Sequence, residues 1–254
     1  MRVALVSHRT WGLTAYACAL APEFDVLEVS SDFITYDELA SRYPADWRPD
    51  AIVCWSIDYM PVPLGIENAD CFTAGIVGDW NMASQSLNCI GNAFDVLLAD
   101  RPGCDVLSAT GFASVRPALL YGFLPEIHRR LPDCQRDIDV LFIGNFNQSV
   151  QAHRAPWLAR LAQLSSRHRV LLATNVHGNE FTKLMNRARI VFNRSIRGEL
   201  NQRAYEAMAC GALMFLERDN VEVDGIVADR NGCVLYGKDD LEELLTYYLE
   251  HEDE

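Results

Sequence analysis

The chain has 254 residues, 50% of them apolar, and its formal net charge at pH 7 is −13. This length can bury one large core or two ordinary ones, and we favour two. The acidic composition argues against binding to a nucleic-acid backbone as the main activity, because such binding needs a basic stripe on the surface. We therefore expect no nucleic-acid partner.

The cysteine pattern bears on the cellular compartment. The eight cysteines are scattered, mostly within apolar runs, and no two of them form a Cys-x-x-Cys pair. This is typical of free thiols in a reducing compartment rather than of a disulfide framework or a zinc site. The first apolar run is too short for a signal peptide and no long apolar span follows. We expect a cytoplasmic protein with no transmembrane segment.

The first half of the sequence alternates short apolar runs with helical segments. Continuous apolar runs of this kind indicate a parallel sheet that is covered on both faces. The expected strands are Val3 to Ser7, Phe24 to Val29, Ala51 to Trp55, Thr73 to Val77, Asp95 to Ala99 and Ser114 to Leu119.

Two polar residues follow strands of this half, His8 after the first and Asp79 after the fourth. Either could act as a general base on a hydroxyl, since histidine titrates near neutrality and a carboxylate in a cleft can be tuned upward. Each also has a structural interpretation. His8 could be a loop histidine bonded to backbone, and Asp79 could cap a following helix.

The segment Tyr121 to Pro132 interrupts the alternation with two prolines and a glycine. We predict a domain boundary there, giving domains 1–125 and 126–254. A second alternating unit begins with the strand Ile138 to Ile143. The residues directly after it, Gly144 and Asn145, lie where a ligand is expected, outside the carboxyl end of a parallel strand. A glycine there lets the backbone approach a phosphate, although a plain turn is the alternative.

The stretch Ile190 to Phe215 predicts a strand, a polar loop, a helix and a second strand. Its loop and first helical turn are far more polar than a crossover between buried strands requires. The polar side chains are Arg194, Arg197, Glu199, Asn201 and Arg203.

Arginine forks match diphosphate oxygens through paired hydrogen bonds. We rank Arg203 first of the three arginines because it shares a helix face with Glu206, three residues later. The alternative is an ordinary crossover stabilised by a salt bridge.

This stretch also carries a resemblance. Glu199-Leu-Asn-Gln-Arg-Ala-Tyr-Glu-Ala-Met-Ala-Cys-Gly-Ala212 resembles the nucleotide-sugar-binding helix of GT-B glycosyltransferases, most nearly the spore-maturation-protein-like branch. Asp139 to Asn145 resembles the opening strand of that family's donor-binding domain. Gly78-Asp-Trp80 and the segment Tyr121 to Arg129 are similar to further features of the branch.

The resemblance departs from the family at one pair of residues. Two glutamates in the superfamily, usually separated by seven residues, face the donor sugar and the ribose. Here Glu199 and Glu206 are separated by six. Only Glu206 therefore carries over cleanly, as the implied ribose ligand.

The resemblance implies an α/β fold of two Rossmann-like parallel-sheet domains facing across a cleft. The implied activity is transfer of a sugar from a nucleotide diphosphate sugar, by default a UDP-sugar, to a hydroxyl acceptor without a required metal or cofactor. The acceptor could be a glycan, a protein or a small molecule. The expected donor-binding residues are Gly144, Asn145, Arg194, Arg197, Glu199, Asn201, Arg203 and Glu206.

Asp79 or His8 would act as the base if the reaction inverts the anomeric centre, and a retaining reaction would need neither. Two other functions stay open. One is a non-catalytic nucleotide-binding or assembly module, suggested by the altered glutamate spacing. The other is a nucleotide-sugar epimerase on the same fold.

Overall fold

The computed structural model describes residues 1–7, 23–32, 34–82 and 84–252. The chain divides into two compact units, Met1–Leu120 and Tyr121–Glu254. Each contains a six-stranded sheet in which the paired strands are parallel. The predicted α/β fold with two Rossmann-like domains is confirmed.

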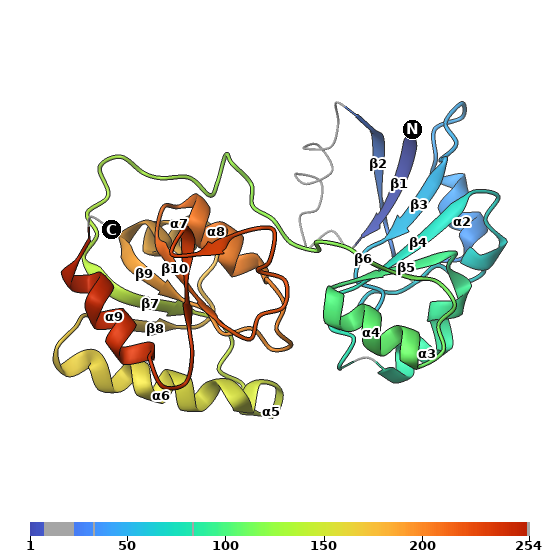
Figure 1. Ribbon diagram of the computed structural model, residues 1–254. Coiled ribbons are helices and arrows are strands. Elements are labelled where there is room, and N and C mark those ends of the chain that lie inside the picture. The colour runs from blue at the N-terminus through green and yellow to red at the C-terminus, as the bar shows by residue number, and fades with distance from the viewer. Residues whose placement is uncertain (8–22, 33, 83, 253–254) are drawn as a thin grey trace. The chain divides into compact units, whose positions relative to one another are not determined.

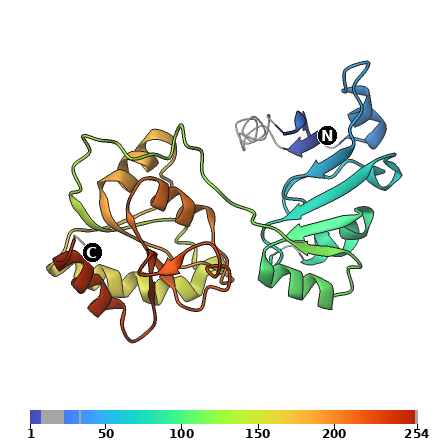
Figure 2. The ribbon, with the colours of Figure 1, turned by 45° about the horizontal axis from the view of Figure 1, so that its top comes forward.

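Unit 1 has the strand order β2-β1-β3-β4-β5-β6. Its α4 packs against β5 and β6 (Figure 2). The elements in chain order are β1 (Arg2–Ser7), β2 (Asp25–Ser30), α2 (Tyr36–Ser41), β3 (Ala51–Cys54), η2 (Ile66–Asn68), β4 (Phe72–Val77), α3 (Ser84–Ile90), η3 (Gly91–Ala93), β5 (Val96–Ala99), α4 (Arg101–Ala109) and β6 (Val115–Pro117).

Helix α4 is tied to the turn that follows β4. Asp100 caps the helix, because its Oδ1 accepts the N–H of Gly103 at 2.7 Å. The same oxygen accepts the indole N–H of Trp80 at 2.8 Å. A Cβ on Gly103 would lie 2.5 Å from the Trp80 ring, so a glycine is needed for this approach. The tie fixes the turn that carries Asp79.

Unit 2 has the strand order β11-β12-β10-β9-β7-β8. Its elements are β7 (Ile138–Ile143), α5 (Gln148–Gln151), η4 (Ala152–Arg154), α6 (Ala155–Gln163), η5 (Leu164–Ser166), β8 (Val170–Ala173), α7 (Gly178–Arg187), β9 (Ala188–Phe192), α8 (Gln202–Ala209), β10 (Leu213–Glu217), β11 (Ala228–Asp229), β12 (Gly232–Tyr236) and α9 (Leu241–Glu250).

The second sheet is buried on both faces (Figure 1). Along β7, Val140 and Phe142 pack toward α6 and α9, whereas Leu141 and Ile143 pack toward α7 and α8. Successive side chains of a strand point to opposite faces, so a strand between two helical layers must be apolar throughout. This is why β7 reads as a continuous apolar run.

The chain that joins β6 to β7 belongs to unit 2 from Tyr121 onward. Leu124 is buried there, and its backbone N–H donates to the ring of His128 at 3.1 Å. Our sequence-based boundary assigned residues 121–125 to the first domain, whereas the division between the units lies between Leu120 and Tyr121.

Within the described ranges, none of the helices combines the length and the apolarity needed to cross a bilayer.

Candidate functional site

The order of the strands in unit 2 reverses at β7 and β9. The chain runs from β7 out to β8, returns to form β9 on the other side of β7, and continues to β10. In open parallel sheets, ligands bind outside the carboxyl ends of the strands at such a reversal. Gly144 follows β7 and Asn193 follows β9, and we call the place between them the switch point.

Arg203, on the first turn of α8, projects into the switch point. Its Nη1 donates to Asn193 Oδ1 at 2.6 Å, and its guanidinium carbon lies 4.7 Å from the centre of the Phe142 ring. A Cβ on Gly144 would lie 2.5 Å from Arg203 Nη2. Gly144 therefore makes room for the guanidinium, and the backbone approach to phosphate that we expect of it stays a prediction.

The charge of Arg203 is held without a carboxylate partner. In the part of the chain that the structure describes, its hydrogen-bond partner is the neutral side chain of Asn193, and no carboxylate forms an ion pair with it. Burial, reinforced by the nearby Arg154, lowers the pKa of the Arg203 guanidinium to about 9. The group is still cationic at neutral pH, so an anion bound here would relieve a real electrostatic cost.

The other two predicted arginines have carboxylate partners. Arg194 donates to both carboxylate oxygens of Asp219, at 2.8 and 3.2 Å, and lies over the Trp157 ring. Arg197 lies 3.8 Å from Glu199, and both side chains are buried. Of the three arginines, Arg203 has the arrangement that an incoming anion requires.

Glu199 turns toward its own loop. Its carboxylate accepts the backbone N–H groups of Ile196 at 3.3 Å and of Arg197 at 2.7 Å. The adjacent N–H of Ser195 donates to Glu217 Oε1 at 3.0 Å. Two buried carboxylates thus stabilise the conformation of this loop by accepting its backbone N–H groups. The donor-binding role of Glu199 stays a prediction, and the present contacts of its carboxylate are structural.

The N-terminus of α8 lacks a side-chain cap. Asn201 occupies the N-cap position, but its side chain makes no capping hydrogen bond, and its Oδ1 is buried with no partner among the described residues. Asn193 is fully enclosed, and its Nδ2 likewise has no partner in that part of the chain. Buried polar atoms are nearly always paired, so orphan atoms beside a helix N-terminus indicate a ligand position, with an anion favoured.

Glu206 lies one turn further along α8 and is 7% exposed. Its Oε1 accepts from Gln202 Nε2 at 2.8 Å and lies 3.3 Å from His128 Nε2. Burial raises the pKa of the Glu206 carboxyl to about 7, while the Gln202 hydrogen bond and Arg203 oppose that rise. The predicted ribose ligand therefore shares one helix, and one electrostatic environment, with Arg203.

Asn145 accepts hydrogen bonds through both its side chain and its backbone carbonyl. Its Oδ1 accepts the N–H of Asn147 at 2.8 Å, which forms a turn before α5. Its carbonyl accepts from Arg154 Nη1 at 3.2 Å. The side chain of Asn145 is exposed and is directed, at present, to this local turn.

Asp79 in unit 1 lies beyond the carboxyl end of β4. Its Oδ2 accepts from the Tyr59 hydroxyl at 2.8 Å, and its N–H donates to Asp58 Oδ2 at 2.6 Å. The capping alternative for Asp79 is wrong for α3, because that helix begins at Ser84. The second candidate base, His8, lies outside the described residues.

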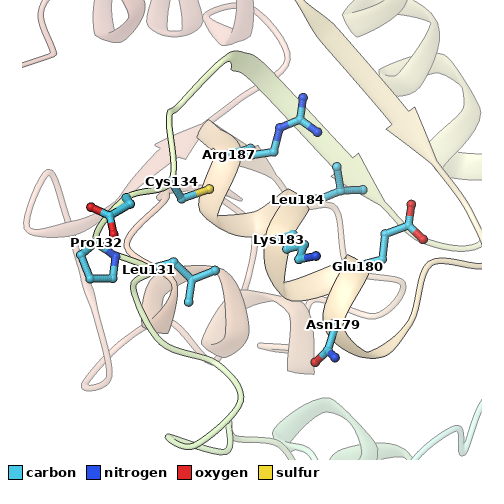
Figure 3. A pocket seen from close by; sticks show the side chains of 9 residues that line it. Leu131, Pro132, Cys134, Asn179, Glu180, Lys183, Leu184 and Arg187 are labelled. Carbon is cyan, nitrogen blue, oxygen red and sulfur yellow. The ribbon is translucent and has the colours of Figure 1, made fainter.

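A wide pocket of about 850 Å³ lies between residues 131–134 and α7 (Figure 3). Lys183 and Arg187 contribute to its wall, and Arg187 is bonded to both oxygens of Asp137, at 2.7 and 2.8 Å. None of the predicted donor-binding residues lines this pocket. Size alone therefore does not identify the site in this molecule.

Comparison with known proteins identifies the family. Residues 122–254, more than half of the chain, match the profile of a family described as glycosyl transferase-like. The chain belongs to this glycosyltransferase-like family. The matched range covers nearly all of unit 2, including every predicted donor-binding residue. No match was found among curated protein sequences.

Solved structures of similar shape cover the whole chain. Sucrose-phosphate synthase from Thermosynechococcus elongatus has 10% identity and a TM-score of 0.61, over 100% of this chain and 90% of that one. An alpha-glucosyltransferase in complex with UDP and a 13-mer DNA containing an HMU base has 11% identity and a TM-score of 0.64, over 100% and 91%. A putative UDP-N-acetylglucosamine 2-epimerase from Listeria monocytogenes has 12% identity and a TM-score of 0.52, over 100% and 88%. At such low sequence identity, these structural similarities show the GT-B fold and nothing about function.

Two residues of this glycosyltransferase-like site were not among the predicted ligands. Asn193 holds Arg203, and the sequence signal for it is a polar residue directly after a buried strand. Arg154 is 3% exposed and donates to the carbonyls of Asn145, at 3.2 Å, and Arg194, at 3.1 and 2.8 Å. Arg154 thus joins the two loops of the switch point.

Proposed function

We propose that this protein is a glycosyltransferase that binds a nucleoside diphosphate sugar at the switch point of unit 2. It would transfer the sugar to a hydroxyl acceptor without a required metal. Family membership supports glycosyl transfer. The observation that carries the donor assignment is Arg203, a cation beside an uncapped helix N-terminus with no carboxylate partner among the described residues.

The proposed roles follow from the charge that develops during the reaction. The bond between the anomeric carbon and the diphosphate oxygen breaks, and the acceptor oxygen forms the new bond while its proton leaves. Negative charge grows on the leaving diphosphate. The Arg203 fork and the first turn of α8 would stabilise that charge, and Glu206 would accept a hydrogen bond from a ribose hydroxyl. Directed donors of this kind support the proposal that no metal is needed.

If the reaction inverts the anomeric centre, the acceptor proton needs a base. Asp79 and His8 are our candidates. The finer family placement, in the spore-maturation-protein-like branch, is supported by Gly78-Asp-Trp80 and by the pair His128-Arg129. UDP is the first nucleotide to test, because one structural neighbour was solved in complex with UDP.

A direct test measures binding of UDP, GDP, ADP, TDP and CDP by calorimetry and by thermal stabilisation. A ligand that binds the native state at a hundredfold excess over its Kd stabilises it by about 2.7 kcal/mol. We expect one nucleotide to bind, and Arg203→Ala to abolish the effect. Arg169→Ala is the matched control, because Arg169 is an exposed arginine of the same unit that pairs with Asp137. Equal binding by both variants would refute the site.

A second measurement, of nucleoside diphosphate release from donor sugars, separates the transferase from a rival function. A non-catalytic module of this fold is favoured by the contacts of Glu199, since one of the two family glutamates is engaged with its own loop. Such a module would bind the nucleotide but release no nucleoside diphosphate from any donor sugar. Release of nucleoside diphosphate from one donor sugar, dependent on an acceptor, would establish the transferase.

A further inference from the structure

The segment that joins the two units places a histidine against Glu206. His128 is 7% exposed, its Nδ1 accepts the N–H of Leu124 at 3.1 Å, and its Nε2 lies 3.3 Å from Glu206 Oε1. The edge of the ring meets Phe181, with 6.3 Å between ring centres. Because Nδ1 accepts a backbone N–H, the proton of the neutral imidazole is on Nε2, which faces Glu206 Oε1.

The two oxygens of Glu206 have different surroundings. Gln202 donates a hydrogen bond to Oε1, and His128 Nε2 faces the same oxygen. No donor from the described residues is bonded to Oε2. A donor on Oε1 from Gln202 and the facing Nε2–H of His128 orient the carboxylate and favour its ionised form. Oε2 is then the oxygen left to accept a hydrogen bond from a ligand.

Two titratable groups near Glu206 lie on or directly after α8. Arg203 favours the ionised carboxylate against the effect of burial, and the Cys210 thiol is neutral because burial raises its pKa to about 11. Helix α7 packs against α8, and its neutral side chains Phe181 and Asn186 contact His128 and Cys210. Burial likewise lowers the pKa of His128, which keeps the imidazole neutral.

We infer that His128 is a positioning residue for Glu206. Its Nε2–H faces Oε1 and favours the ionised form of the carboxyl, whose Oε2 is directed to a hydroxyl of the ribose of a bound nucleoside diphosphate. The identity of the ligand rests on the proposed function. The positioning itself rests on the contacts of His128 and Glu206.

A purely structural role can be separated from this one. The joining segment has a second attachment, because Asn186 Oδ1 accepts the N–H of Leu131 at 2.7 Å and Asn186 Nδ2 donates to the Arg129 carbonyl at 3.0 Å. The segment should therefore stay in place when the contact between His128 and Glu206 is lost.

Two substitutions of His128 separate the role of Nδ1, which accepts from Leu124, from that of Nε2, which faces Glu206. In His128→Asn the amide oxygen takes the place of Nδ1, so the Leu124 bond is kept and the donor to Glu206 is lost. In His128→Gln the amide nitrogen takes the place of Nε2, so the donor is kept. The carboxyl carbon of Glu206, assigned in NMR spectra with Glu206→Gln, is titrated in each protein, and UDP affinity is measured at pH 6.5 and 8.5.

We expect the Glu206 titration midpoint to rise by about one pH unit in His128→Asn and to stay at the parent value in His128→Gln. UDP affinity should fall about tenfold in His128→Asn at pH 6.5, where more of the carboxyl is protonated, and less at pH 8.5. The glutamine variant should bind UDP like the parent at both pH values.

Other outcomes are equally decisive. An unchanged midpoint in His128→Asn, or equal behaviour of the two variants, would overturn the positioning role. Loss of the folded state in His128→Asn would show that His128 is structural and would also overturn it. A midpoint that shifts as expected in a protein that binds none of the five nucleotides would support the positioning of Glu206 and refute the proposed function.

Discussion

Replacing Arg203 by methionine tests whether this arginine is kept for binding or for stability. Its lowered pKa of about 9 corresponds to a free-energy cost of about 5 kcal/mol for holding the charge in the folded protein, at 1.36 kcal/mol per pKa unit. The side chain is only partly buried, and solvent screening reduces this cost to about 2–3 kcal/mol. Methionine fills a similar volume without this cost.

Two losses oppose that gain. The contact of the guanidinium with the Phe142 ring contributes about 1 kcal/mol, and an unpaired Asn193 Oδ1 costs about 1–3 kcal/mol. The terms nearly cancel, so we expect the free energy of unfolding of Arg203→Met to stay within about 1 kcal/mol of the parent value. UDP binding should weaken at least about a hundredfold, because a charge-assisted fork to the diphosphate is lost.

Arg154→Met is the matched control. Both arginines lie over the Phe142 ring, with guanidinium carbons 5.4 and 4.7 Å from its centre. Arg154 satisfies two backbone carbonyls, so its loss should destabilise the fold by about 3 kcal/mol. Calorimetric unfolding and UDP titration of the three full-length proteins provide the comparison. If Arg203→Met is destabilised as much as Arg154→Met and still binds UDP, Arg203 is structural and our reasoning is wrong.

Two further predictions concern the acidic residues. Burial raises the pKa of folded Glu206 from 4.5 to about 7, so the folded state binds this proton more tightly than the unfolded state does; stability should therefore fall by about 3 kcal/mol as pH rises through this window. Glu206→Gln should lack this loss in equilibrium unfolding at pH 4.5 and 8, and parallel stability curves would contradict the assignment. Asp79→Asn should keep UDP affinity and slow an inverting transfer at least about a hundredfold. Tyr59→Phe, which removes the hydroxyl that donates to Asp79 and contacts Met82 Sδ but keeps the carboxylate, should cost much less. Unchanged turnover in Asp79→Asn would exclude it as the base.

The fold could be predicted from the sequence because its signals are local. The continuous apolar run of β7 is required by burial on both faces, and the structure shows its side chains dividing between two helical layers. The end of α8 is marked by a local signal of the same kind. Gly211 adopts a φ of 77°, in the left-handed region that a helix-ending glycine favours.

The site could be predicted only in part, because whether an arginine is paired with a carboxylate depends on residues far away in the sequence. Arg194 and Arg203 look alike in the sequence, yet Arg194 pairs with Asp219, 25 residues away, and Arg203 has no carboxylate partner in the described ranges. Arg154 reaches a carbonyl 40 residues along the chain. No local pattern contains these pairings, so sequence could nominate the three arginines of the loop but could not rank them by charge compensation.

An acidic protein with a proposed anionic ligand presents an apparent conflict, which the geometry resolves. Glu199 and Glu217 lie near the switch point, but both accept backbone N–H groups of the loop that follows β9, from Arg197 and Ser195. Arg154 and Arg203 form no ion pair with a carboxylate from the described residues. The local charge is therefore close to balanced, and long-range attraction contributes little. Recognition of a diphosphate would depend on short-range, directed donors, which is why the loss of the single fork at Arg203 should matter more than any change in net charge.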